Sequence, residues 1–357
     1  FPYTTLFRSQ RDHTLGDMVS AILEGKPDKN LILVTGRIHP KLAEDVAEQL
    51  GIDVLETTAY DFANGEMYVR YTESVRGADV FVLQSHYKPI NKAIMEQLIM
   101  IDALKRASAR SITAVCPLVG YSRQDKKHRG REPISCRLVF DLLKTAGADR
   151  IMSVDLHAAQ SQGFFDGPVD HLVAMPVLVD YIRDRFQGHL DNVAVVSPDA
   201  GRIRVAEQWA QRLGGGPLAF VHKTRDITRP NQVVANRVVG DVAGKDCVLV
   251  DDLIDTAGTI AGACHVLQDA GAKSVTVVAT HGVLSGPAIE RLKNCGAREV
   301  VLTDTVPIPE EKRWDGLTVL SIAPLLASAI RAVFEDGSVA ELFDTYPEHH
   351  GQGFLFA

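Results

Sequence analysis

Two adjacent acidic residues separate a strongly apolar run from a run of small residues in the last third of the chain. Cys247–Val250 is apolar, Asp251 and Asp252 follow it, and the stretch from Asp255 to Thr259 is rich in small residues. The pattern predicts a buried strand, two acids at its end, and a turn that opens a helix. Such a turn can direct several backbone N–H groups at one phosphate, and the helix dipole adds to the attraction. Because acids beside a phosphate suit sugar hydroxyls or a metal ion, the segment predicts a sugar phosphate site.

Two further residues stand where predicted strands end. His157 and Asp199 each follow a short apolar run, and the carboxyl ends of parallel strands gather at the usual ligand-binding edge of a sheet. A lone histidine at such a place is as often structural as functional. Beside a triphosphate, the pair fits Mg²⁺, which takes few protein ligands together with phosphate oxygens and water.

Lys223 and Arg225 follow the predicted strand Leu218–His222 and open the polar stretch 226–231, which has no apolar periodicity. We expect this stretch to be a mobile loop that begins where the strand ends. Cations on such a loop can neutralise a triphosphate and exclude water when the loop closes. Taken alone, residues of this kind more often belong to an ordinary charged surface loop.

The composition is that of a globular protein and disfavours several classes. Of 357 residues, 46% are hydrophobic and 23% charged, and the formal net charge of −7 argues against a general binder of nucleic acid or anionic membranes. No apolar run reaches the length of a membrane span, and the first ten residues lack a signal-peptide pattern. The five cysteines form no Cys-x-x-Cys pair, so we expect buried, reduced thiols in a cytoplasmic protein.

The order of elements predicts an α/β fold with two similar open parallel sheets. In four places a helix ends in small residues, a tight turn follows, and a short apolar strand begins, as at Ala270–Ser274. Repeated α/β units of this kind build parallel sheets. The predicted strands are Leu31–Thr35, Val80–Gln84, Ile112–Val115, Ile151–Val154, Val193–Val196, Leu218–His222, Cys247–Val250, Val275–Val278 and Val300–Leu302. The predicted helices are Pro40–Leu50, Asn91–Ala107, Cys136–Ala146, Met175–Phe186, Arg202–Leu213, Ile260–Ala270, Pro287–Cys295 and Ala323–Phe334.

We expect a domain change near residue 175. Residues 30–175 then form an N-terminal domain, residues 176–345 a C-terminal domain, and residues 346–357 a flexible tail. Residues 1–29 are expected to be a lead-in that is partly non-native, because the first ten residues look unrelated to the rest of the chain. Asn91 is expected to cap its helix, and Pro176 suits a first helical turn.

Common nucleotide-binding motifs are absent from the sequence, which disfavours a P-loop kinase and a dinucleotide-dependent dehydrogenase. Instead, the run 248–259 resembles the phosphoribosyl-diphosphate signature of type I phosphoribosyltransferases. Further motifs narrow the resemblance, and they occur in chain order as Phe62–Glu66, Glu73–Gly77, Gly120–Asp125, Val154–His157, Val196–Asp199 and His222–Arg225. Together they resemble the ribose-phosphate diphosphokinases, over residues 30–345.

The resemblance implies a role for each motif. It places ATP against Phe62, Asn64, Gly65, Glu66, Arg123, Gln124 and Asp125. It implies Mg²⁺ at His157 and Asp199, and catalytic cations at Lys223 and Arg225. It places ribose 5-phosphate against Arg225, Asp251, Asp252, Asp255, Thr256, Ala257, Gly258 and Thr259. The basic run 126–131 would lie near subunit contacts where phosphate or ADP regulates.

A few residues depart from the family pattern. Ala257 stands where many members have Gly, and we expect no backbone strain there because other small residues are tolerated at this position. Asn64 replaces an Asp of some members, and Leu118-Val119 stands where aromatic residues are common. None of these changes removes a predicted catalytic group.

The implied reaction is a Mg²⁺-dependent transfer of the diphosphoryl group of ATP to the C1 hydroxyl of ribose 5-phosphate, yielding phosphoribosyl diphosphate and AMP. The implied assembly is a homo-oligomer, commonly a hexamer, with ATP near a subunit boundary. Two alternatives remain: a phosphoribosyltransferase that consumes the diphosphate, and a non-catalytic regulatory relative. The first needs no separate ATP pocket, and the second would not need Lys223, Arg225, His157, Asp199 and the acid pair.

Overall fold

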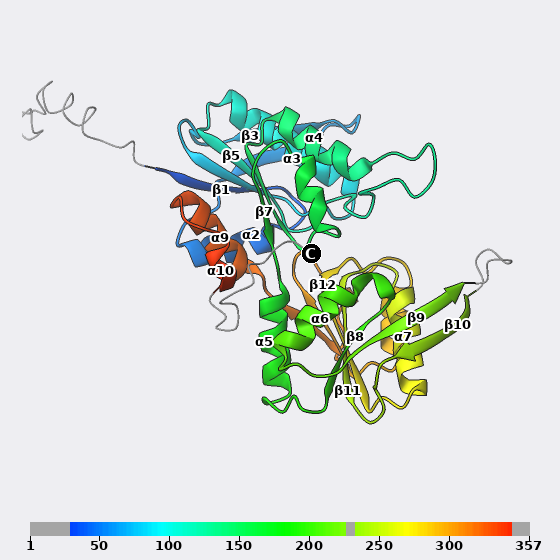
Figure 1. Ribbon diagram of the computed structural model, residues 1–357. Coiled ribbons are helices and arrows are strands. Elements are labelled where there is room, and N and C mark those ends of the chain that lie inside the picture. Colours follow the sequence, from blue (N-terminus) through cyan, green and yellow to red (C-terminus); the bar gives the residue numbers. More distant parts are fainter. Residues whose placement is uncertain (1–28, 226–232, 345–357) are drawn as a thin grey trace, which may run out of the picture. The chain divides into compact units, whose positions relative to one another are not determined.

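The computed structural model describes residues 29–225 and 233–344 of the chain (Figure 1). The predicted lead-in, except its last residue, the predicted tail and the stretch 226–231 lie outside these ranges. The described residues from Leu31 onward belong to one compact unit, and only that unit is described below. Within the described helices, none is long and apolar enough to cross a membrane.

The first sheet contains five parallel strands in the order β1-β4-β5-β6-β7. Its strands are β1 (Leu31–Thr35), β4 (Asp79–Leu83), β5 (Ser111–Cys116), β6 (Arg150–Val154) and β7 (Val169–Leu172). The helices that connect them are α2 (Pro40–Leu50), α3 (Ile90–Arg106) and α4 (Ser135–Ala146). A separate antiparallel pair, β2 (Thr57–Asp61) and β3 (Met67–Tyr71), forms a hairpin between α2 and β4.

The second sheet contains seven strands in the order β10-β9-β8-β11-β12-β13-β14, and only the β9–β10 pair is antiparallel. Its strands are β8 (Val193–Ser197), β9 (Leu218–Arg225), β10 (Val233–Val239), β11 (Asp246–Ile254), β12 (Ser274–Gly282), β13 (Glu299–Thr303) and β14 (Leu317–Leu320). The helices are α5 (Met175–Arg185), α6 (Ile203–Arg212), α7 (Gly258–Asp269), α8 (Ala288–Asn294), α9 (Ala323–Phe334) and α10 (Glu341–Asp344). Short 3₁₀ turns are η1 (Ala159–Phe164), η2 (Ala200–Arg202) and η3 (Glu310–Lys312). The prediction of an α/β fold with parallel sheets is confirmed.

One hydrophobic cluster joins elements of both sheets. It includes Leu42 and Val46 of α2, Leu178 of α5, and Leu326 and Ile330 of α9. The last long helix, α9, therefore packs on α2 near the start of the described chain, and Arg331 donates a hydrogen bond to the Gln49 carbonyl at 3.2 Å. Two further clusters fill the space between each sheet and its other helices.

All the predicted strands and helices are present, but five strands were not predicted from the sequence: β2, β3, β7, β10 and the short edge strand β14. Thr57–Asp61 is mostly polar and half exposed, so it carries no clear alternation of apolar and polar residues. Pro176 lies in the first turn of α5, as predicted. Asn91 does not cap α3, because that helix already begins at Ile90 and the Asn91 side chain instead accepts a hydrogen bond from Tyr121.

Candidate active site

The acid pair lies inside a strand rather than after it. Strand β11 continues through Asp251 and Asp252 to Ile254, because β12 is equally long and pairs with it up to Gly282. The prediction that the acids follow the strand end is thus wrong, because the strand continues past both of them. The two acids remain in contact, because the Asp252 N–H donates to Oδ1 of Asp251 at 2.9 Å.

Asp252 makes the closest contacts of the site. Its Oδ2 lies 2.8 Å from Nδ1 of His157, which comes from the turn after β6. The same oxygen accepts a hydrogen bond from the guanidinium of Arg202, at the end of η2 after β8. Arg202 Nη2 also lies 2.8 Å from His157 Nδ1. Three strand ends, those of β6, β8 and β11, thereby meet at one carboxylate.

The surroundings shift the pKa values of Asp251 and Asp252 in opposite directions. Burial, followed by the charge of Asp252, raises the pKa of Asp251 well above its usual range. Burial also acts to raise the pKa of Asp252, but the hydrogen bond with His157 and the charge of Arg202 outweigh it and hold that pKa below its ordinary value. Asp252 is therefore the more acidic of the two carboxyl groups.

The predicted phosphate loop follows β11 directly. Asp255 and Thr256 form a turn, Ala257 precedes the helix, and Gly258 and Thr259 open α7. Arg291 of α8 donates to the Thr256 carbonyl at 2.9 Å, and the Ser285 N–H donates to the Asp255 carbonyl at 2.8 Å, so the loop is tied from behind. This arrangement, a strand, a short turn and a helix N-terminus, confirms the local structure expected from the sequence.

Ala257 corrects one expectation. Its backbone has φ +57° and ψ +10°, in the left-handed region, and the residue is buried. A non-glycine residue pays roughly 1–2 kcal/mol in this conformation because its Cβ approaches the next carbonyl oxygen. The expectation of an unstrained backbone is thus wrong, and the loop holds strain at its central residue.

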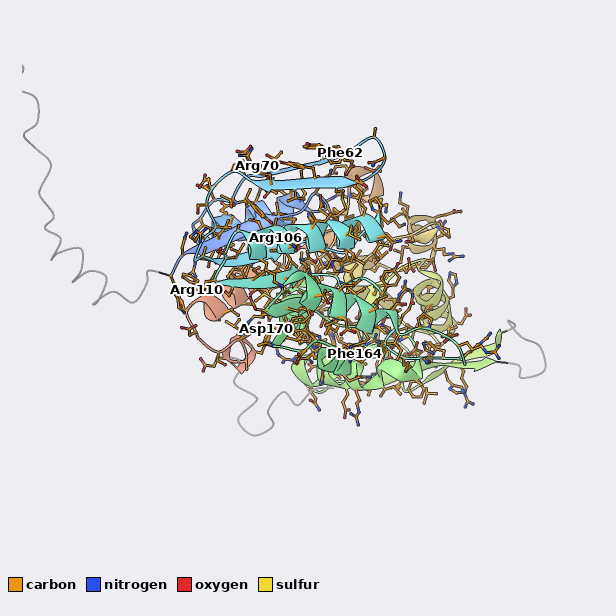
Figure 2. The ribbon with its side chains drawn as sticks, turned by 90° about the horizontal axis from the view of Figure 1, so that it is seen from above. Phe62, Arg70, Arg106, Arg110, Phe164 and Asp170 are labelled. Atoms are coloured by element: carbon orange, nitrogen blue, oxygen red, sulfur yellow. The ribbon has the colours of Figure 1, made fainter. Side chains whose placement is uncertain are left out.

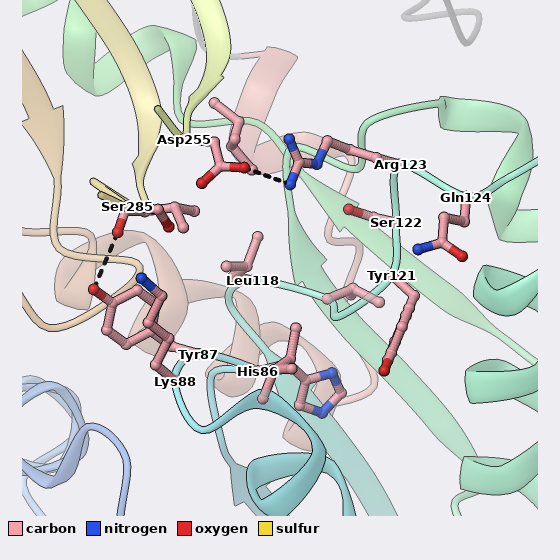
Figure 3. A pocket seen from close by; sticks show the side chains of 14 residues that line it. His86, Tyr87, Lys88, Leu118, Tyr121, Ser122, Arg123, Gln124, Asp255 and Ser285 are labelled. Carbon is pink, nitrogen blue, oxygen red and sulfur yellow. Dashed lines mark hydrogen bonds and ion pairs between the residues drawn. The ribbon is translucent and has the colours of Figure 1, made fainter. Parts of the chain in front are cut away.

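Arg123 connects the first half of the chain to this loop. Its guanidinium donates to Asp255 Oδ2 at 2.8 Å across a pocket that His86, Lys88, Tyr121 and Ser285 also line (Figure 3). Asp255 is partly buried, which raises its pKa, yet the hydrogen bonds from Ser285 and Arg123 keep that pKa below its ordinary value. Gln124 lines the same pocket, and no hydrogen bond of the Asp125 side chain is seen among the described residues.

A buried histidine supports the segment that carries Arg123. Nδ1 of His86 accepts the Gly120 N–H at 2.9 Å, and Nε2 lies 2.7 Å from Oε1 of Gln97, so Nε2 carries the proton. Complete burial lowers the pKa of His86 to about 4. The neutral imidazole is required, because a protonated Nδ1 could no longer accept from Gly120.

The predicted adenine-binding residues lie on the β2–β3 hairpin, apart from this cluster. Phe62 is 46% exposed and packs edge-on against Tyr60, with ring centres 5.3 Å apart. Figure 2 labels Phe62 at the outer edge of the side chains drawn. Asn64 accepts the Glu66 N–H at 3.1 Å and Gly65 has φ +90°, so they shape the tight turn of the hairpin. In the described parts of the chain, no hydrogen bond or ion pair joins Phe62–Glu66 to His157, Asp252 or Asp255.

Charged side chains tie the base of the hairpin to the first sheet. Asp61 forms ion pairs with Lys92 and, at 2.9 Å, with Arg37. Arg37 in turn pairs with Glu96, whose side chain is almost completely buried in α3. This chain of charges fixes where the hairpin leaves the body of the protein.

The remaining predicted site residues are placed less completely. Asp199 begins η2 and its Oδ1 accepts the Gly201 N–H at 2.9 Å, three residues before Arg202. Lys223 and Arg225 lie within β9, which pairs with β10 up to Arg225 opposite Val233. The prediction that the strand ends at His222 is wrong, because the antiparallel partner extends it; the side chains of Lys223 and Arg225 lie outside what the structure describes.

The donor atoms around His157 determine whether a metal ion fits this site. No group of three or more His, Cys, Asp or Glu side chains gathers for a metal ion within residues 29–225 and 233–344. His157, however, has its Nδ1 2.8 Å from a carboxylate oxygen of Asp252, a contact of the kind that orients metal-binding histidines. Because Mg²⁺ prefers oxygen ligands and takes most of them from phosphate and water, the carboxylate of Asp199 fits it directly and the imidazole of His157 fits it through a bound water.

Arg202 is the residue that sequence reasoning missed. It stands three positions after Asp199 in Asp199-Ala200-Gly201-Arg202, and its side chain is only 20% exposed. Within the motif it looks like one more surface arginine. Its role becomes visible only in the structure, where Arg202 contacts His157 and Asp252, which are far from it in the sequence.

Together these features define a class: an α/β protein with a strand–turn–helix loop beside a cluster of charged side chains from three strands. Known proteins agree. The N-terminal domain of ribose phosphate pyrophosphokinase matches residues 31–147, and the phosphoribosyl synthetase-associated domain matches residues 227–344. The sequence is 99% identical over 340 residues to a ribose-phosphate pyrophosphokinase of Bifidobacterium longum, covering 95% of this chain and 100% of that protein.

More distant relatives give the same result. A ribose-phosphate pyrophosphokinase of Corynebacterium efficiens is 66% identical over 316 residues, 88% of this chain and 96% of that protein. The crystal structure of a phosphoribosylpyrophosphate synthetase from Mycobacterium smegmatis is similar, with a TM-score of 0.82 and 64% identity, covering 87% of this chain and 100% of that one. The chain belongs to the ribose-phosphate pyrophosphokinase family, and it is an enzyme of that family.

Proposed function

We propose that this enzyme transfers the β,γ-diphosphoryl group of ATP to the C1 hydroxyl of ribose 5-phosphate. The products are 5-phospho-α-D-ribose 1-diphosphate and AMP, and the reaction serves nucleotide biosynthesis. The observation that carries the proposal is the contact of Asp252 with His157 beside the loop Asp255–Thr259. It brings an acid suited to sugar hydroxyls and a histidine suited to a metal-bound triphosphate within one hydrogen bond.

The sugar phosphate occupies the second sheet in this proposal. The backbone N–H groups from Thr256 to Thr259 bind the 5-phosphate at the start of α7, and Asp255 lies at the mouth of that loop. The ionised Asp252 and its neighbour Asp251 accept hydrogen bonds from ribose hydroxyls. Arg225 approaches the same substrate from β9.

ATP occupies the first half of the chain. Phe62 stacks on the adenine, with Asn64, Gly65 and Glu66 along the hairpin turn, while Arg123, Gln124 and Asp125 follow the phosphates. Lys223 and Arg225 stabilise the transferring group and the departing AMP. Because positioning and charge stabilisation dominate phosphoryl transfer, the cations carry most of the rate enhancement.

Mg²⁺ on the triphosphate would be held near His157 and Asp199. When bound, it supplies charge neutralisation at the phosphate oxygens. His157 would contact it through a bound water, and Nδ1 of the ring is engaged by Asp252. Asp199 lies on the same turn as Arg202, which reaches His157.

The wider setting follows from the family. We infer a cytoplasmic homo-oligomer, a hexamer by family resemblance, with phosphate and ADP acting on the basic run 126–131. Residues 30–175 form the ATP-side domain and residues 176–345 the sugar-phosphate domain. The packing of α9 on α2 fastens the second of these onto the first.

One assay tests the reaction against its two alternatives. Purified protein is incubated with ATP, ribose 5-phosphate and Mg²⁺, and AMP formation is followed. We expect AMP in step with phosphoribosyl diphosphate. A phosphoribosyltransferase or a non-catalytic relative would release no AMP, and that result would contradict the proposal.

The role of Lys223 has its own test. Lys223→Ala should lower kcat on the order of 10²–10³-fold, the usual loss for one donor to the transition state. Lys41→Ala is the control, because Lys41 is a surface residue whose side chain is 71% exposed. Near-normal turnover of Lys223→Ala would remove Lys223 from the catalytic residues.

A further inference from the structure

Two side chains of the turn after β6, those of His157 and Asp155, are bonded to the second sheet. His157 contacts Asp252 in β11, and Asp155, two residues earlier, accepts a hydrogen bond from the Thr280 hydroxyl in β12 at 2.6 Å. In the register of the two strands, Asp252 and Thr280 stand between the same flanking pairs, Asp251 with Ala279 and Leu253 with His281. The two bonds therefore reach neighbouring positions on adjacent strands.

Asp155 is fixed by several other contacts. Its Oδ2 also accepts the Ala174 N–H at 3.1 Å, just before α5, and its own N–H donates to the Leu172 carbonyl at 2.9 Å. Its backbone has φ +41°, in the left-handed region, where Asp is tolerated better than most residues. A conformation of this kind persists only where surrounding contacts enforce it.

The far side of the attachment is completely buried. His281 Nε2 lies 3.1 Å from the Asp155 carbonyl, and its Nδ1 lies 2.9 Å from the Thr305 hydroxyl. The Ser85 hydroxyl donates to the Thr305 carbonyl, and Thr303 donates to the Thr280 carbonyl at 2.6 Å. We call Ser85, Asp155, Thr280, His281, Thr303 and Thr305 the seam, since they join the two sheets by polar contacts.

Thr280 and Ala174 share Oδ2 of the Asp155 carboxylate, so this oxygen is engaged within the protein. What Asp155 does determine is the orientation of the turn. The Thr280 hydroxyl is the contact that ties the Asp155 carboxylate to β12, while Ala174, Leu172 and His281 hold the residue through other bonds. Without the hydroxyl, the carboxylate loses its partner in β12 and the turn that carries His157 can shift.

We propose that Asp155 and Thr280 are positioning residues that fix His157 relative to Asp252, and so align the metal side of the reaction with the sugar side. The proposal rests on the proposed function, because it assigns no chemistry of its own to either residue. It predicts that losing the Thr280 hydroxyl misplaces His157 while the phosphate loop keeps its geometry. The loss should thus appear in kcat and spare the KM for ribose 5-phosphate.

The test compares three variants of one strand. Thr280→Val removes the hydroxyl at nearly constant shape, Thr280→Ser restores it, and Thr276→Val makes the same change at another buried threonine of β12, four residues earlier. We expect Thr280→Val to lower kcat about tenfold to 10²-fold, the scale of a small misplacement of a catalytic group. Its KM for ribose 5-phosphate should change by less than about threefold, and both Thr280→Ser and Thr276→Val should stay within about threefold of the parent protein.

Several results would overturn the proposal. One is equal activity of Thr280→Val and Thr276→Val. Another is a Thr280→Val protein near normal while Asp155→Asn loses activity, since Asp155 would then act on substrate or metal directly. Thermal unfolding of each variant separates loss of fold from loss of alignment: a Thr280→Val protein that melts like Thr276→Val but turns over more slowly supports the proposal.

A double mutant decides through which residue the seam acts. In a His157→Asn background, Thr280→Val should change kcat by less than about threefold, because the group that it positions is already gone. A full further loss would show that the seam acts elsewhere. Absence of AMP formation by the parent protein would contradict the proposed reaction itself, whereas an active parent whose kcat is insensitive to Thr280→Val contradicts only the role of the seam.

Discussion

The hairpin β2–β3 and the segment β11–α7 offer two contrasting ways to prepare a binding site. On the hairpin, Phe62 is almost half exposed and packs against its aromatic neighbours. In β11, Asp252 is held by a histidine and an arginine from two other strand ends before any substrate arrives. The proposed sugar side is thus held in place by side-chain contacts, whereas the proposed adenine side presents an exposed aromatic side chain.

The contrast has an energetic meaning. A buried, paired carboxylate is costly to disturb, whereas an exposed ring contributes little to the folded chain until it is covered. Substitutions on the sugar side should therefore affect both stability and turnover. Substitutions on the hairpin should affect ATP binding alone.

Arg202→Met should have the largest effect on stability. Removing the guanidinium leaves Asp252 buried without its cationic partner, and breaking such a pair costs about 3 kcal/mol or more in unfolding free energy. Urea denaturation measures the loss, with Arg204→Met on the exposed side of α6 as control, expected within about 0.5 kcal/mol of the parent. Equal losses for the two variants would show that the Arg202 contact is not the stabilising one.

Low pH should have the next largest effect on stability, because it protonates His86, which holds the segment that carries Arg123. An unfolded His86 takes up a proton near pH 6.5, whereas the folded one does so only near a pKa of about 4, so the unfolded chain binds more protons in between. The contribution of His86 to the free energy of unfolding should fall by about 3 kcal/mol as the pH drops from 6.5 to 4, and it should be constant above pH 6.5. The other buried histidines with lowered pKa, His39, His171 and His281, act in the same direction.

A substitution of His86 isolates its contribution to the pH dependence of stability. His86→Asn keeps an acceptor for the Gly120 N–H and should flatten the pH dependence between 6.5 and 4, measured by urea denaturation at each pH. His128→Asn, in the exposed basic run, should leave the curve of the parent protein unchanged. Parallel curves for the parent and His86→Asn would contradict the assignment.

Phe62→Ala should separate the two regions most cleanly. Stacking of a base on an aromatic ring contributes about 1–3 kcal/mol, so the KM for ATP should rise about tenfold while the KM for ribose 5-phosphate is unchanged. Unfolding free energy should change by less than about 1 kcal/mol, as for an exposed residue. Met95→Ala, at an equally exposed position of α3, is the control and should leave both KM values as they are.

Ala257→Gly should give the smallest effect, with a positive sign. Glycine relieves the left-handed strain but makes the unfolded chain more flexible, for a net gain of about 0.5–1 kcal/mol. Ala261→Gly, one turn into α7, should instead cost about 1 kcal/mol, since its backbone is helical. Thermal unfolding of the two proteins should thus move in opposite directions.

The sequence predicts the sugar side better than the adenine side, for a physical reason. The run Cys247–Thr259 is continuous in the chain, so its strand, acids and turn can be read from local patterns. The hairpin has no such pattern, because β2 is short and polar, and Phe62 is identified only through family resemblance. Arg202 and the seam could not be predicted at all, since each contact joins residues that the chain brings together from distant strands.

Strand ends were the most frequent error, at β9 and β11. In both cases the apolar run stops before the strand does, because pairing continues with the neighbouring strand. Residues that follow an apolar run can therefore belong to the strand and be fixed by it. At Asp251 and Asp252, this added rigidity supports the proposed role in holding ribose hydroxyls.

The packing of α9 on α2 has a consequence for synthesis of the protein on the ribosome. The apolar face of α2, with Leu42, Ala43 and Val46, is made early, and its partner α9 is made late. Chains grow from the N-terminus, and exposed apolar surfaces favour aggregation until they are covered. The apolar face of α2 thus stays uncovered by α9 until the ribosome has synthesised the chain as far as Phe334. A nascent chain of this enzyme therefore needs α9, the last long helix of the described residues, to cover the apolar face of α2.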